Sequence, residues 1–135
     1  MSSEPQSDHQ KHQTSNPYEA EFGYSRAVRK GPFIFVSGTT SISPSTGELL
    51  HPESVYNQAS QIFGEIITAV QALGGKKEDI TRIRMFVTHI EDTGAVGRAM
   101  KEVLGDVGPA ATMIVGSRFV DENMKVEIEA DAVVL

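Results

Sequence analysis

Three carboxylates alternate with apolar residues near the C-terminal end of the chain. Between Val126 and Val134 every second residue is apolar, and Glu127, Glu129 and Asp131 fall between them. This two-residue period is typical of a strand with one face in a core, so we expect the acids on its other face. Glu127 and Glu129 would lie about 7 Å apart. A carboxylate pair at that spacing can perform acid–base or glycoside chemistry, whereas a solvated outer face is the simpler interpretation, and the residues alone leave both open.

The other reactive residue types are isolated. Ser37 precedes Gly38 at a strand end, where a serine usually forms a turn, and no base lies near it in sequence to make it a nucleophile. The chain has no cysteine, which excludes thiolate catalysis, disulfides and iron–sulfur clusters. We expect no metal site, because the histidines lack ligand spacing apart from a pair in a polar N-terminal stretch: His9, His12, His51 and His89.

Charge and hydropathy narrow the class of protein. A formal net charge of −6 does not attract nucleic acid. No apolar run approaches the roughly 20 residues that cross a bilayer. The N-terminus has neither the apolar core of a secretory signal nor the arginines of a transit peptide. We therefore expect a cytoplasmic protein without a membrane or nucleic-acid partner.

Composition divides the chain at about residue 22. Residues 1–22 are polar and rich in Ser, Gln and His, and they predict a disordered tail because they offer little apolar area to bury. Residues 23–135 predict one domain. Arg26 and Lys30 lie on the same face of its first strand, where we expect an ordinary solvated surface.

Periodicity predicts strand, strand, helix, strand, helix, strand, strand. The strongest element is the helix at 53–75, whose apolar residues recur three and four apart before Gly74 and Gly75 end it. The other elements are expected at 24–31, 33–38, 80–90, 93–106, 109–119 and 126–134.

Two helices cannot cover both faces of such a sheet. The pattern therefore predicts an α+β fold with both helices on one face and the other face open. Phe86 and Met113 are candidates for the open face, and their apolar surface favours another subunit as its cover.

Six segments in this order resemble the Rid family of reactive-intermediate deaminases, also called YjgF-like or L-PSP proteins. They are "GYSRAV", "FIFVSGTTSISPSTGEL", "NQASQIFGEIITAVQALGG", "EDITRIRMFVTHIED", "PAATM" and "KVEIEADAV". The resemblance covers residues 23–135. It implies a chorismate-mutase-like fold, with a single-layer mixed sheet and two helices on one face, and a homotrimer with small pockets between subunits.

The resemblance also assigns roles. Family deaminases hydrolyse 2-imino acids to 2-keto acids and ammonia without a cofactor. Glu127 falls where they keep a glutamate that orients the attacking water, and Tyr24 where a tyrosine lines the pocket. Glu129 and Asp131 match no catalytic position.

The chain departs from the family pattern at the substrate-binding positions. Ala111 stands where the family "PARS" motif has an arginine that clamps the substrate carboxylate, Gly97 where deaminases offer an asparagine, and Met113 where they have a cysteine. Arg118 lies an odd number of residues from Ala111, so it should point to the opposite face and not substitute.

These departures predict a roomier, more apolar pocket that rejects small 2-imino acids, because a carboxylate would meet Glu127 without a cation. We expect acid–base chemistry on a neutral imine or enamine, without a cofactor. A non-catalytic trimer that binds a small molecule or a protein is the alternative. Endoribonuclease activity is disfavoured by the acidic charge.

Overall fold

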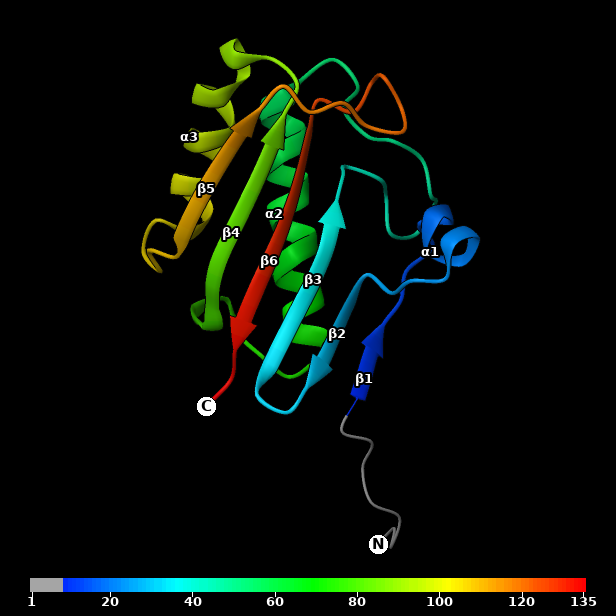
Figure 1. Cartoon of the computed structure of the whole chain (residues 1–135), viewed down its shortest axis with the longest axis vertical. Coiled ribbons are helices and arrows are strands. Elements are labelled where there is room, and N and C mark those ends of the chain that lie inside the picture. The colour runs from blue at the N-terminus through cyan, green and yellow to red at the C-terminus, as the bar shows by residue number, and fades with distance from the viewer. Residues whose placement is uncertain (1–8) are drawn as a thin grey trace, which may run out of the picture.

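Six strands form one sheet, and the two long helices lie on the same face of it. In the view of Figure 1, α2 and α3 lie behind the sheet. The computed structural model describes residues 9–135. The elements are β1 (His9–His12), α1 (Pro17–Phe22), β2 (Ala27–Lys30), β3 (Phe33–Thr39), α2 (Val55–Ala72), η1 (Lys77–Asp79), β4 (Ile80–Val87), η2 (Ile90–Asp92), α3 (Thr93–Leu104), β5 (Ala110–Val115) and β6 (Val126–Val133).

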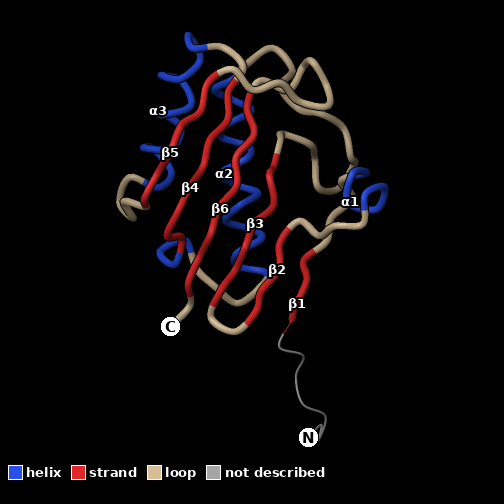
Figure 2. Tube along the Cα trace, viewed as in Figure 1, coloured by secondary structure: helices blue, strands red, loops and turns tan. Residues whose placement is uncertain are grey.

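The strand order is β1-β2-β3-β6-β4-β5, and the sheet is mixed. β4 and β5 pair in parallel, and all other neighbours are antiparallel. Figure 2 shows β6 in the centre, between β3 and β4. The C-terminal strand, which carries the three acids, is therefore surrounded by sheet on both sides. The expected α+β architecture, with one mixed sheet and two helices on one face, is confirmed.

The core lies between this sheet and the two helices. Alternate residues of β6 and β4 are fully or almost fully buried, as their two-residue period predicts: Val126, Ile128, Ala130 and Ala132, and Ile83, Met85 and Val87. Burying each larger aliphatic side chain contributes about 1.5–3 kcal/mol. The same burial fixes the register, because a shift by one residue would turn the acids of β6 into the core.

Helix α2 covers the middle of the sheet. Ser54 caps its start by accepting a hydrogen bond from the backbone N–H of Asn57 (3.1 Å), and Gly74, at φ 89°, follows its end. Ile62, Phe63 and Ile66 are completely buried. Within residues 9–135, none of the helices combines the length and apolar character needed to cross a membrane.

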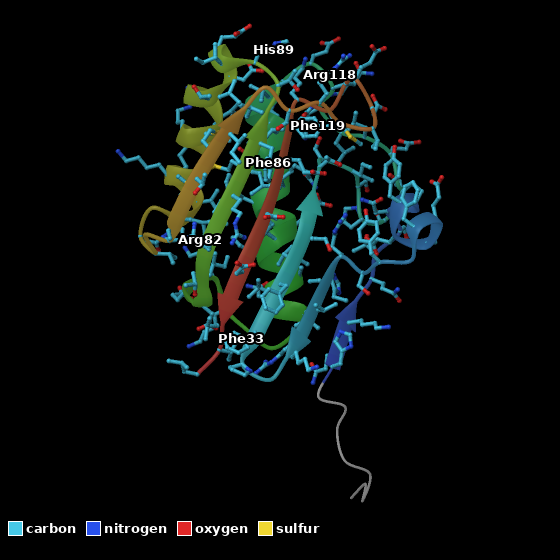
Figure 3. The ribbon with its side chains drawn as sticks, in the orientation of Figure 1. Phe33, Arg82, Phe86, His89, Arg118 and Phe119 are labelled. Carbon is cyan, nitrogen blue, oxygen red and sulfur yellow. The ribbon has the colours of Figure 1, made fainter. Side chains whose placement is uncertain are left out.

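The open face of the sheet is apolar in part, but Met113 does not belong to it. Met113 pairs with Met85 in the parallel β4–β5 ladder, so both side chains point to the helix side, and Met113 packs against the core. Its assignment to the open face was wrong because the register of β5 cannot be read from the sequence. Phe33 and Phe35 do lie on the open face, about half exposed at 49% and 47%, and Phe86 also projects from it (Figure 3).

The structure differs from the predicted disordered tail over residues 9–22. β1 pairs with β2, and α1 packs beside the end of the sheet (Figure 1). Glu19 is 3% exposed and accepts hydrogen bonds from the backbone N–H and hydroxyl of Thr14. Backbone hydrogen bonds and a buried polar network order residues 9–22. An amino-acid composition does not reveal such contacts, so the prediction from composition failed here. Residues 1–8 of the expected tail lie outside the described residues.

Candidate active site

One cation divides the acids of β6 into two groups. Nη1 of Arg84, on neighbouring β4, lies 3.3 Å from Oε1 of Glu129 and 3.2 Å from Oδ2 of Asp131. Glu127 forms no ion pair with Arg84 and has Phe86 as its partner across the strands. Arg84 therefore neutralises the repulsion between Glu129 and Asp131, whereas Glu127 is not paired with it.

Glu127 lies in a small pocket at the end of the sheet beside α1, which we call the Glu127 pocket. Its volume is about 120 Å³. The lining combines an acid, a cation and two phenols with an amide, a hydroxyl and apolar groups: Asn16, Tyr18, Phe22, Tyr24, Arg26, Gly38, Thr40, Val120, Met124 and Glu127. The family resemblance implied a catalytic role for Glu127 and a place in the pocket wall for Tyr24. Both residues line this pocket within one chain.

Burial raises the pKa of Glu127 above its ordinary value. The positive charge of Arg26 opposes this rise, and the negative charge of Glu129 adds to it. Gly38 approaches the carboxyl so closely that a Cβ there would lie 3.0 Å from Cδ of Glu127. The result is a half-buried carboxyl whose pKa is moved towards neutrality, as suits a general base.

Arg26 is the cation of this pocket, and its expected place on a solvated face was wrong. It is 3% exposed. Its Nη2 donates to the carbonyl of Gly38 (2.9 Å), its Nη1 lies 3.8 Å from Oε2 of Glu19, and its guanidinium carbon lies 5.4 Å from the ring centre of Tyr24. Arg26 directly precedes β2, and the buried acid of α1 draws its side chain inward.

Gln58 holds the loop that closes one side of the pocket. This fully buried amide donates to the carbonyls of His51 and Asn123 (3.0 and 2.9 Å) and accepts from the backbone N–H of Lys125 (2.9 Å). Met124, on the same loop, lines the pocket. Helix α2 therefore fixes the loop that leads into β6 and, with it, the position of Glu127.

The remaining predicted site residues do not reach this pocket within one chain. Ala111 and Met113 lie on β5, which β4 separates from β6, and Gly97 lies on α3. Arg118 lines a separate groove with His89 and Phe119, at the top of the view in Figure 3. Only a second copy of the chain could bring β5 or α3 to the Glu127 pocket.

Sequence reasoning missed Arg26, Gly38 and the wall provided by α1. One signal was present: Asn16 followed by Pro17, with Glu19 in the first turn and Gly23 after the last, is the pattern of a capped helix. Asn16 does cap α1, accepting from the backbone N–H of Tyr18 (3.0 Å). No group of three or more potential metal ligands gathers anywhere in residues 9–135.

Comparisons with known proteins agree with this fold. The family model described as Endoribonuclease L-PSP matches residues 14–134. A Streptomyces coelicolor protein described as uncharacterized is 36% identical over 121 residues, which cover 89% of this chain and 88% of that protein. The 2-iminobutanoate/2-iminopropanoate deaminase of Escherichia coli strain K12 is 31% identical over 123 residues, covering 89% of this chain and 94% of the enzyme.

A solved structure from Mycobacterium tuberculosis, described as a member of the YjgF/YER057c/UK114 family, superposes with a TM-score of 0.83 at 29% identity. The match covers 93% of this chain and 99% of that one. The α+β sheet, the carboxyl pocket at its end and the sequence similarity over nearly the whole domain together define the class of protein. The chain belongs to the YjgF/Rid family, as its sequence resemblance indicated.

Proposed function

We propose that this protein hydrolyses an uncharged imine or enamine to a carbonyl compound and ammonia, with Glu127 as the general base. The observation that carries the proposal is the half-buried carboxyl of Glu127 beside Tyr24, with a pKa raised by burial. Family membership and the relatives named as imine deaminases support the reaction class.

The proposed chemistry needs only a base, water and the substrate. Glu127 takes a proton from water as the water oxygen attacks the imine carbon, and the C=N bond becomes a C–N single bond. Glu127 passes this proton to the nitrogen, which gives a neutral carbinolamine. It then takes the proton of the new hydroxyl group and delivers it to the nitrogen, so that the C–N bond breaks, ammonia leaves and the C–O bond becomes a carbonyl. A carboxyl whose pKa is raised towards the working pH accepts this proton more effectively than an ordinary glutamate.

The charges of the side chains around the Glu127 pocket favour an uncharged substrate. The single positive charge of Arg26 is shared between Glu19 and Glu127, so the ionised cluster is net negative. A substrate carboxylate would add a second uncompensated negative charge in a partly dry site, where like charges repel several times more strongly than in water. Ala111, which we propose replaces a clamping arginine, offers no compensation.

We propose that the working form is a homotrimer. Phe33 and Phe35 leave large apolar surfaces on the open face of the sheet, and Ile114 on β5 is 44% exposed. Packing the open faces together would bury these side chains. We further propose that the β5 edge and α3 of a neighbour lie beside the Glu127 pocket and bring Ala111 and Gly97 to it; Met113 packs against the core of its own subunit and does not line that pocket.

The test compares Glu127→Gln with Glu129→Gln, a control on the same strand face. An amine oxidase generates an imine from an unsubstituted primary amine, and semicarbazide competes for it. We expect the wild type to suppress semicarbazone formation, Glu127→Gln to lose about 10²–10⁴-fold in rate, and Glu129→Gln to stay near the wild type. Equal rates for wild type and Glu127→Gln would overturn the assignment.

A non-catalytic, ligand-binding role is the second candidate, because the carboxyl that could act as a base could also hold a ligand by hydrogen bonds. It gains support if the wild type hydrolyses no imine and yet is stabilised against thermal unfolding by such compounds. We do not propose endoribonuclease activity, because the chain is acidic and Glu127, Glu129 and Asp131 lie on its open face.

A further inference from the structure

A second cavity lies between helix α2 and residues 9–22, which we call the N-terminal segment. We call this cavity the Glu65 cavity. Its volume is about 290 Å³, more than twice that of the Glu127 pocket. Most of its lining residues have polar side chains, and they come mainly from one side of α2: His12, Thr14, Arg26, Pro44, Ser60, Gln61, Gly64, Glu65 and Thr68. A cavity of this size accommodates a small metabolite.

Two buried side-chain polar atoms in residues 9–135 lack a hydrogen-bond partner, and both belong to residues that line this cavity. They are Nε of Arg26 and Oε2 of Glu65. Arg26 is 3% exposed, so its Nε–H has no access to bulk solvent. A buried polar group without a partner is costly, and such groups are rare in folded proteins. Their meeting at one cavity indicates that something else completes their hydrogen bonds.

We propose that the Glu65 cavity binds a small uncharged molecule that presents a carbonyl oxygen next to an N–H group, as in a lactam, a primary amide or a urea. The carbonyl oxygen accepts from Nε–H of Arg26. The neighbouring N–H donates to Oε2 of Glu65. Hydroxyl groups of Ser60 and Thr68 in the wall offer further partners of either kind.

Charge argues for an uncharged ligand. Arg26 already has Glu19 at 3.8 Å, so an added anion would be repelled by Glu19. An added cation would instead meet Arg26. Burial also raises the pKa of Glu65 to about 8, which keeps its carboxyl largely neutral at physiological pH. A neutral amide edge matches both protein groups without adding a charge to either side of the cavity.

The test uses 2-pyrrolidinone as the probe and cyclopentanone, a ring of similar size without the N–H, as its chemical control. Backbone amide signals of Ser60, Gln61, Gly64 and Thr68 are followed by NMR on the full chain. We expect saturable shifts with a millimolar dissociation constant for the lactam, as suits so small a ligand. Binding of the ketone should be about tenfold weaker.

Two variants locate the binding. A Cβ at Gly64 would meet nothing within 4 Å, so Gly64→Leu can fill the cavity without displacing its walls; Gly94→Leu, at an equally open helix position on α3, is the matched control. Gly64→Leu and Glu65→Leu should abolish the lactam shifts. Gly94→Leu and Glu127→Gln should keep them, which separates this site from the proposed hydrolysis. No saturable shifts in the wild type, or unchanged binding in Gly64→Leu, would overturn the proposal.

Discussion

The carboxyl of Glu127 packs directly against the backbone of Gly38. A Cβ at position 38 would lie 3.0 Å from Cδ and 3.1 Å from Oε1 of Glu127, closer than most such contacts in proteins. The absence of a side chain at Gly38 thus leaves room for the carboxyl of Glu127 in its present position.

We predict that Gly38→Ala displaces the carboxyl of Glu127 and leaves the fold intact. The clash falls on the end of a flexible side chain, which can rotate away at small cost. Imine hydrolysis should fall to near the level of Glu127→Gln, because a misplaced base loses its geometry with the water. Activity and melting temperature are measured together. Retained activity would show that the position of the carboxyl is not critical.

Glu19→Ala should lower the free energy of unfolding by about 3 kcal/mol, because it leaves buried Arg26 without its acid. Glu21→Ala, an exposed position in the same short helix, is the control and should cost less than about 0.5 kcal/mol. Urea denaturation measures both. If Glu19→Ala behaves like its control, the N-terminal segment contributes little to the fold.

Stability should depend on pH through Glu65. Its pKa is raised from 4.5 to about 8 in the folded chain, mainly by burial. Between these values the folded chain binds the proton and the unfolded chain does not, so the free energy of unfolding falls as the pH rises through this range. Glu127, whose pKa is also raised, acts in the same direction. Urea denaturation across the range should show a flatter profile for Glu65→Gln and an unchanged one for exposed Glu53→Gln.

Light scattering should give three times the 14.6 kDa chain mass for the wild type. Phe35→Glu should dissociate the trimer, because Phe35 is 47% exposed on the open face and pairs with Asp131 across the strands, so the new acid would be buried beside another. Ile90→Glu, at an exposed apolar position on η2, should stay trimeric. A monomeric wild type at micromolar concentration would contradict the proposed assembly.

Ala111→Arg should confer partial activity on 2-iminopropanoate if a neighbour's β5 meets the Glu127 pocket. The planar guanidinium would bind the substrate carboxylate through two hydrogen bonds, which the ammonium of the control Ala111→Lys cannot reproduce. The gain should vanish when Glu127→Gln is added. An Ala111→Arg trimer that stays inactive would show that position 111 does not face the pocket.

The sequence predicted the sheet and both long helices, because two-residue and 3.6-residue periods report directly which faces are buried. The family resemblance, not the periodicity, implied that Tyr24 and Glu127 line one pocket, and both do line the Glu127 pocket. The sequence did not predict that Arg26 is buried. Placement of that side chain depends on Glu19, which lies in a segment dominated by polar residues. It also misplaced Met113, because the face of an edge strand depends on its pairing with β4.

The N-terminal segment forms the outer wall of both cavities. His12 and Thr14 line the Glu65 cavity, and Asn16, Tyr18 and Phe22 line the Glu127 pocket. None of these side chains belongs to the core of the sheet and long helices. Exchanging this one short stretch, by natural variation or by grafting it from a relative, would therefore change the walls of both cavities and leave the central scaffold unchanged.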